Sequence, residues 1–148
     1  MLDGTFKLEP DASLAIAGFS FPAFSGDGAF RNRRTHMCLP DQGPIPVGTY
    51  FILDRQSGGH LGEIHRLIKG DWFALYADDR VIDDERYCAG LLRGQFQLHA
   101  KGSQGLSQGC ITLDRRYDFD LLYQVLKMTT MQDIPGTEYM TYGKIRVS

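Results

Sequence analysis

Two short segments of alternating apolar and polar residues, separated by a loop rich in glycine and serine, constrain the fold of this chain most strongly. They lie at the two ends of residues 95–113, QFQLHAKGSQGLSQGCITL. Apolar residues at every second position are typical of a strand with one buried face, and glycine with serine is typical of a connection. The stretch therefore predicts two short strands joined as a hairpin by residues 100–109.

This hairpin would bring one histidine and one cysteine together. Successive side chains of a strand point to opposite faces, so with the apolar side chains in the core His99 and Cys110 share the polar face. An imidazole beside a thiol takes its proton, and the imidazolium then holds the nucleophilic thiolate. Gly109 lacks a side chain and lets backbone N–H groups approach a substrate carbonyl as an oxyanion hole, while Ser107 is placed to orient the loop or the imidazole. The alternative is an unreactive, buried structural cysteine.

The rest of the chain predicts a single, mainly β domain over residues 1–148 with one or two helices. Alternation and β-branched or aromatic residues predict strands at 4–8, 13–19, 50–53, 72–76 and 143–147. The length suits one domain, and no repeat divides it.

One amphipathic helix is expected after residue 117. Asp118 is its expected N-cap, and an apolar stripe from Phe119 to Leu126 follows. Residues 25–46 form a long connection rich in Gly, Pro, Asp and Arg, which we expect to border a cleft. Its arginines are either a solvated face or a contact for carboxylates of a peptide. The acidic residues between 79 and 86 are expected to be exposed charge.

Composition and charge exclude several classes of function. The formal net charge is −2, so no electrostatic argument favours nucleic acid or an anionic membrane as a partner. No apolar run approaches the roughly 18 residues that a membrane span needs. The first ten residues, MLDGTFKLEP, lack a basic segment followed by an apolar one, so no signal peptide is expected.

Three cysteines leave two alternatives open. In an oxidising compartment Cys38 and Cys88 would pair and leave Cys110 as the remaining thiol; otherwise both are reduced and buried. No C-x-x-C or H-x-x-x-H spacing occurs, which argues against a zinc site. We therefore expect neither a metal nor another cofactor.

The order of the reactive residues resembles a known signature. His99 followed by Ser107-Gln108-Gly109-Cys110-Ile111 resembles the L,D-transpeptidases (YkuD-like domain), in which a histidine precedes a Ser/Thr-X-Gly-Cys turn. With residues 21–26, 43–50 and 71–76, the stretch 109–113 resembles the branch of L,D-transpeptidase-like toxins delivered by bacterial type VI secretion systems.

The resemblance extends from about Gly4 to Val147. Two positions depart from the wider family: Gln108 stands where many members carry His, and Thr112 where many carry Arg or Asn. Both positions flank the cysteine, so they bear on the choice of acceptor and on substrate orientation.

This resemblance implies a β-barrel or β-sandwich of the L,D-transpeptidase type and a peptidoglycan stem tetrapeptide as substrate. Cys110 would attack the carbonyl of the diamino acid and expel the terminal D-alanine through a thioester, with His99 as base and then acid. Ser107, Gln108 and Gly109 would form the oxyanion hole or orient the loop. Water as acceptor gives L,D-carboxypeptidase activity, and an amine gives L,D-transpeptidase exchange.

The same resemblance implies an antibacterial effector. It would be made in the cytoplasm without a signal peptide, secreted, and active in the periplasm of a target bacterium. Its partners would be the stem peptide, a cognate immunity protein and the secretion machinery.

Two other functions stay open from the sequence. One is a different cysteine hydrolase, such as an amidase or a papain-like peptidase; those usually place Cys before His, whereas His99 comes first here. The other is a non-catalytic wall-binding module, for which Cys110 would be unreactive.

Overall fold

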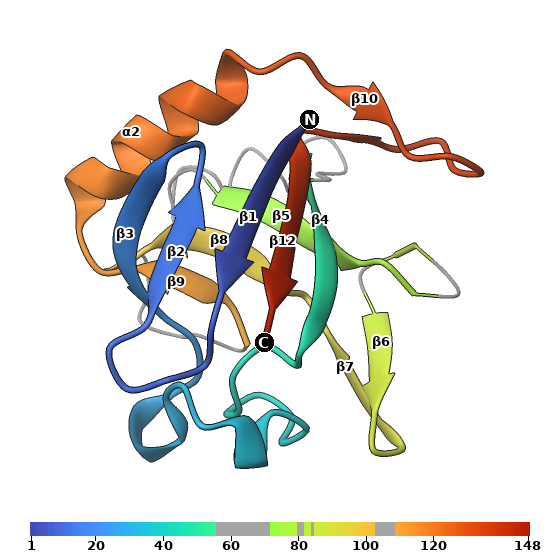
Figure 1. Cartoon of the computed structure of the whole chain (residues 1–148). Coiled ribbons are helices and arrows are strands. Elements are labelled where there is room, and N and C mark those ends of the chain that lie inside the picture. The colour runs from blue at the N-terminus through green and yellow to red at the C-terminus, as the bar shows by residue number, and fades with distance from the viewer. Residues whose placement is uncertain (56–71, 80–81, 84, 103–108) are drawn as a thin grey trace.

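Eight strands close into a barrel in the order β1-β12-β4-β5-β8-β9-β3-β2 (Figure 1). The computed structural model describes residues 1–55, 72–79, 82–83, 85–102 and 109–148. The barrel strands are β1 (Leu2–Phe6), β2 (Ser13–Ile16), β3 (Phe19–Phe24), β4 (Gly48–Asp54), β5 (Trp72–Ala77), β8 (Gln97–Ala100), β9 (Ile111–Leu113) and β12 (Gly143–Val147). The prediction of a mainly β fold is confirmed.

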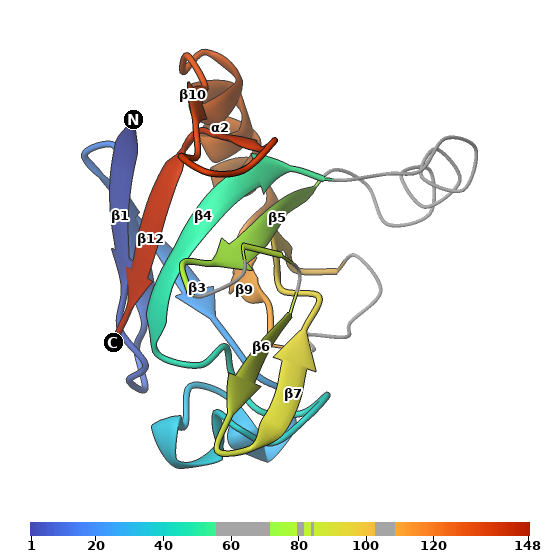
Figure 2. The same ribbon diagram turned by 90° about the vertical axis from the view of Figure 1, so that its right-hand side faces the viewer.

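The remaining elements lie outside the barrel. Two small two-stranded sheets, two 3-10 turns and one α-helix occur within the described ranges. They are β6 (Glu85–Cys88) with β7 (Leu91–Gly94), β10 (Gln132–Asp133) with β11 (Met140–Thr141), η1 (Gly28–Phe30), η2 (Arg34–His36) and α2 (Arg116–Lys127). Figure 2 shows the β6–β7 hairpin beside the segment that holds η1 and η2.

Strands β4 and β5 are buried on both faces. Their inner side chains belong to the barrel core. The outer ones, Phe51, Leu53, Ala74 and Tyr76, form a second cluster with Ile134. The segment that carries β10 and β11 covers this outer face, where the ring of Tyr139 lies edge-on to Tyr76 at 5.2 Å between centroids. This second layer explains why residues 50–53 and 72–76 are continuous apolar runs and do not alternate.

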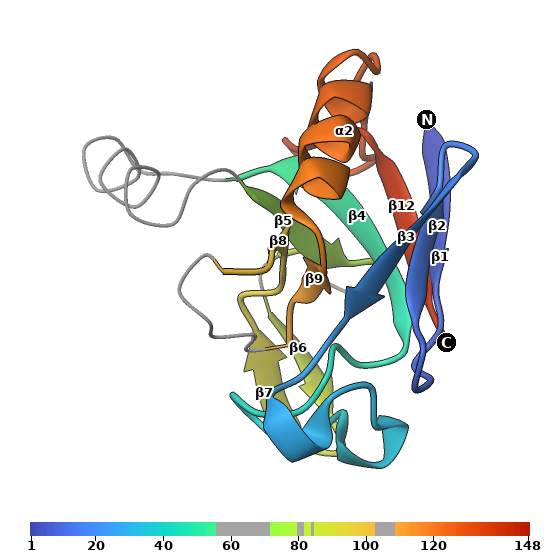
Figure 3. The same cartoon turned by 90° about the vertical axis from the view of Figure 1, so that its left-hand side faces the viewer.

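Helix α2 packs its apolar stripe on the barrel (Figure 3). Phe119, Leu122 and Leu126 are fully buried, and the Phe119 ring lies 6.2 Å from that of Phe73 in β5. The predicted N-cap is wrong by three residues: the cap position is Arg115, without a capping side-chain hydrogen bond, and Asp118 lies inside the first turn. A carboxylate there is still favourable, because the helix N-terminus carries a partial positive charge.

The predicted hairpin of residues 95–113 is wrong in direction. Strands β8 and β9 pair in parallel, with Leu98 opposite Ile111 and His99 opposite Thr112. Strand β8 is only four residues long, about 13 Å, so the connection over residues 101–110 is long enough to return to the end where β8 began. β9 therefore runs parallel to β8 and antiparallel to β3.

Gly143 sits where β1 and β12 meet. It is the register partner of Leu2 in this parallel pair, and a Cβ added there would overlap the Leu2 carbonyl. We expect Gly143→Ala to lower the free energy of unfolding by about 1–3 kcal/mol, because the strands must separate to admit the methyl group. Urea denaturation measures this, and an unchanged midpoint would contradict the close approach.

Candidate functional site

His99 and Cys110 lie on adjacent strands and on the same side of the sheet. His99 is the third residue of β8, and Cys110 directly precedes β9. His99 is in register with Thr112, and Cys110 is two residues before Thr112, so all three side chains point away from the barrel core. Cys110 is therefore a diagonal neighbour of His99 across the two strands.

The sequence predicts a polar face on this side of the sheet, but in the structure the side chains there are buried. His99 is 7% and Cys110 3% exposed, and Thr112, the register partner of His99, is 2% exposed. A thiol and an imidazole shielded from bulk water interact more strongly than exposed ones.

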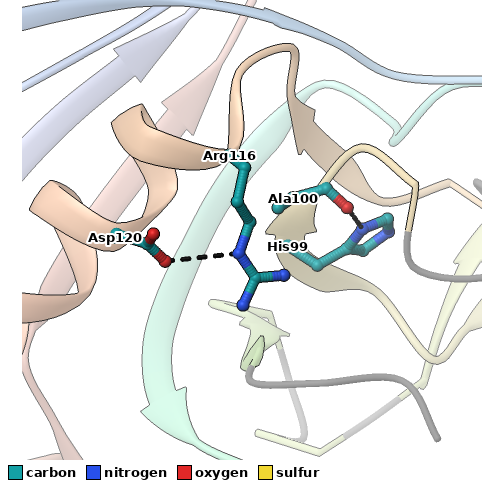
Figure 4. Close-up of polar contacts among 4 residues, drawn as sticks. All are labelled: His99, Ala100, Arg116 and Asp120. Carbon is teal, nitrogen blue, oxygen red and sulfur yellow. Dashed lines mark hydrogen bonds and ion pairs between the residues drawn. The ribbon is translucent and has the colours of Figure 1, made fainter.

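The His99 ring is oriented by its own strand. Its Nδ1 lies 2.9 Å from the Ala100 carbonyl oxygen, as Figure 4 shows. The same figure also draws the ion pair between Arg116 and Asp120 of α2. A carbonyl oxygen only accepts hydrogen bonds, so Nδ1 carries the hydrogen and Nε2 is the basic nitrogen of the neutral ring. The ring can therefore take up a proton at Nε2.

A cavity of about 120 Å³ opens beside His99. Two cations and one acid line it, Arg31, Lys101 and Asp27. The Arg31 guanidinium lies 3.8 Å from the centre of the Phe24 ring, and Lys101 pairs with Asp114 at 3.4 Å. Thr112 Oγ1 is buried at the same cavity and has no hydrogen-bond partner among the described residues. The side chains that line the cavity next to the imidazole therefore carry two positive charges and one negative charge.

A larger depression, of about 720 Å³, lies elsewhere on the barrel. It is lined by Phe51, Asp78, Asp79, Ile82, Lys144 and residues 134–139. None of these residues belongs to β8 or β9, and no cysteine or histidine is among them. The smaller cavity is the better candidate, because chemistry follows the reactive side chains and not the volume.

Arg93, which the sequence did not single out, is buried next to the cysteine turn. The residue is 3% exposed, and its guanidinium donates to the backbone carbonyls of Met37, Gly43 and Pro44. Burial lowers the pKa of this guanidinium, while electrostatic interactions with Tyr50, Asp41 and Cys110 act to raise it. Arg93 therefore lies within electrostatic range of the Cys110 sulfur.

Among the three residues predicted to form the oxyanion hole or orient the loop, only Gly109 lies in the described part of the chain. It has φ +87°, a conformation that favours glycine, and a Cβ there would collide with the Arg93 guanidinium and lie 3.0 Å from the Phe96 ring. Ser107 and Gln108 lie outside the described residues, as does the predicted glycine-rich turn 56–62.

Cys38 and Cys88 form a disulfide, with their Cα atoms 5.2 Å apart. The sequence left open whether these two cysteines are paired or reduced, and in the structure they are paired. The bond joins the connection 25–46 to the end of β6. Cys110 is the third cysteine and lies outside this bond.

Neither a metal cluster nor a membrane helix is found in the described ranges. No group of three or more His, Cys, Asp or Glu side chains there is placed to hold a metal ion. No helix in the same part of the chain is long and apolar enough to cross a membrane.

The fold and the site define the class as a small, mainly β protein with a closed barrel, in which a histidine and a cysteine lie on neighbouring strands and a cavity opens beside the histidine. Residues 20–137 match the family model described as the Tlde1 domain, a match that includes both His99 and Cys110. The chain belongs to the Tlde1 domain family, which is a family of type VI secretion effectors. No curated protein matches the chain.

Proposed function

We propose that this effector is a cysteine enzyme that attacks peptidoglycan stem peptides, as an L,D-carboxypeptidase, an L,D-transpeptidase, or both. The observation that carries the proposal is the placement of His99 on the strand next to the one that Cys110 precedes, together with the bond from Nδ1 to Ala100 that leaves Nε2 as the basic nitrogen. The His-before-Cys order and the Ser-X-Gly-Cys turn support this chemistry over that of amidases and papain-like peptidases.

The proposed reaction has two halves. In the first, Nε2 of His99 takes the Cys110 proton, and the thiolate adds to the carbonyl carbon of the diamino acid at position three of the stem. The tetrahedral oxyanion collapses, the C–N bond to D-alanine breaks, and the His99 proton passes to the leaving amine. In the second, water or an amine attacks the thioester and the thiolate leaves, which restores the enzyme.

Backbone N–H groups at the turn would stabilise the oxyanion. Gly109, without a side chain, allows the carbonyl to approach, and Ser107 and Gln108 are proposed to complete or orient this loop. Removing one such donor typically costs about 2.7–4 kcal/mol of transition-state stabilisation.

The cavity beside His99 supports a substrate with a carboxylate near the scissile bond. Arg31 and Lys101 supply positive charge, and Thr112 Oγ1 supplies a hydroxyl donor. A stem tetrapeptide ends in the carboxylate of D-alanine, one residue from the attacked carbonyl. Charge-assisted hydrogen bonds to this carboxylate would hold the carbonyl near Cys110.

Action in the periplasm of a target bacterium fits the disulfide, since such bonds persist in oxidising compartments. Trimming tetrapeptides removes donors for later cross-links, which would make the enzyme toxic. A cognate immunity protein and the secretion machinery are the partners that this role requires.

Product analysis tests the proposal. The purified protein is incubated with tetrapeptide muropeptides, with or without an added D-amino acid, and the products are identified by mass spectrometry. We expect release of D-alanine, tripeptide in water, exchanged tetrapeptide with the added amine, and a transient thioester on Cys110. Intact substrate, or cleavage at the amide that joins the stem to the sugar, would overturn it.

A further inference from the structure

The β6–β7 hairpin carries two arginines side by side that serve different parts of the molecule. Arg86 and Arg93 are directly opposite one another in the hairpin. Arg86 donates to the Val47 carbonyl at 3.0 Å and to the Tyr50 hydroxyl at 3.3 Å. Arg93 reaches a different place, the turn that precedes β9.

Arg93 is held rigidly. Two of its nitrogens donate to three carbonyls of one short segment, at 3.2 Å to Pro44 and 3.3 Å to Gly43 as well as to Met37. Its guanidinium also lies 5.5 Å from the centre of the Phe96 ring. Carbonyl oxygens carry only partial charge, so these bonds orient the cation without neutralising it.

The same guanidinium touches the turn that carries the thiol. It fills the space where Gly109 would otherwise bear a side chain, and its charge interacts with Cys110. A fixed cation in a water-poor site stabilises a nearby thiolate strongly, because few solvent dipoles screen it.

We propose that Arg93 is a positioning residue for Cys110: its guanidinium locks the Gly109–Cys110 turn against residues 37–44 and stabilises the cysteine in its thiolate form. This inference deepens the proposed function and rests on it for the catalytic consequence. The cation acts in addition to His99, and it stays charged whether the imidazole is neutral or protonated.

Titration of the thiolate tests this directly. Its ultraviolet absorbance is followed against pH, with a Cys110→Ala protein as the blank. We expect Arg93→Gln to raise the pH midpoint by about one unit or more, so that the thiolate fraction well below the midpoint falls at least about tenfold. D-alanine release at neutral pH should fall by a similar or larger factor.

Arg86→Gln is the matched control, because it removes a guanidinium from the same hairpin without contact to Gly109. Its midpoint should stay within a few tenths of the wild-type value. An equal shift in both variants, or no shift in Arg93→Gln, would overturn the proposal.

Arg93→Lys keeps the inference testable if Arg93→Gln does not fold. Lysine retains the charge but cannot span three carbonyls, so we expect a near-normal midpoint with slower turnover. If Arg93→Lys raised the pH midpoint of the thiolate by about one unit or more, as expected for Arg93→Gln, the positive charge of residue 93 would not be what stabilises the thiolate. The titration is independent of peptidoglycan: a shifted midpoint without D-alanine release by the wild type would reject only the proposed function.

Discussion

A Cys110→Ala protein is expected to release no measurable D-alanine from tetrapeptides, a loss of at least about 10⁴-fold in kcat. No other cysteine can substitute, because Cys38 and Cys88 are joined to each other. The fold should survive, since alanine replaces a small buried side chain and leaves the backbone of the turn unchanged. Mass spectrometry of the products measures the loss, and circular dichroism verifies the fold.

The base can be tested in the same assay. His99→Ala should lower kcat by about 10²–10⁴-fold, the usual contribution of a positioned acid–base group. His36→Ala is the matched control: its ring packs against Phe30 at 4.9 Å and takes no part in the pair. Turnover by Cys110→Ala at the wild-type rate, or a His99→Ala effect no larger than that of His36→Ala, would contradict the proposed chemistry.

Residue type, together with alternation where it occurs, predicted several strands well. The expected strand 143–147 coincides with β12, and 50–53 and 72–76 fall inside β4 and β5. These segments are β-branched or aromatic and pack on one or two apolar layers, so local preference and tertiary packing agree. The catalytic pairing of His99 with Cys110, which alternation suggested, stays a prediction.

Alternation cannot give the direction of a neighbouring strand. Both a hairpin and a parallel pair place His99 and Cys110 on one side of the sheet, so the sequence did not distinguish them. The direction of β9 is set by β3, its antiparallel neighbour, which comes about ninety residues earlier in the chain. Such long-range pairing leaves no local signal.

In the β6–β7 hairpin, apolar side chains are exposed and a charged side chain is buried, the reverse of the usual pattern. Leu91 and Leu92 are each 48% exposed, whereas Arg93 is buried. Its turn, Ala89-Gly90, has φ of +50° and +81°, a type I′ geometry that Asn-Gly normally signals and Ala-Gly does not. Hydropathy therefore gave no reason to place a strand or a functional arginine there.

The hairpin has little apolar burial of its own to hold it, which makes the disulfide important. Tyr87 is 73% exposed, and an isolated two-stranded sheet is marginally stable in water. The Cys38–Cys88 bond closes a loop with a sequence separation of 50. In the chain-entropy model, a loop of this length corresponds to about 4 kcal/mol of stability.

A Cys38→Ser/Cys88→Ser protein is therefore expected to lose about 4 kcal/mol of unfolding free energy, a shift of about 2 M in the urea midpoint. Intact mass after thiol blocking under denaturing conditions should show one blocked cysteine in the oxidised wild type and three after reduction. The disulfide-intact Cys110→Ala protein is the matched control, and reductant should lower its midpoint by the same amount. Equal midpoints for the double variant and the wild type would contradict a stabilising bond.

Removing the disulfide should also affect the Gly109–Cys110 turn. Cys38 directly follows Met37, whose carbonyl accepts from Arg93, and Cys88 lies on the strand paired with that of Arg93. Without the disulfide these two segments are joined mainly by hydrogen bonds, so the guanidinium is held less firmly beside Gly109. The Cys38→Ser/Cys88→Ser protein should then show a raised thiolate midpoint under conditions where it is still folded, in the same direction as Arg93→Gln and smaller.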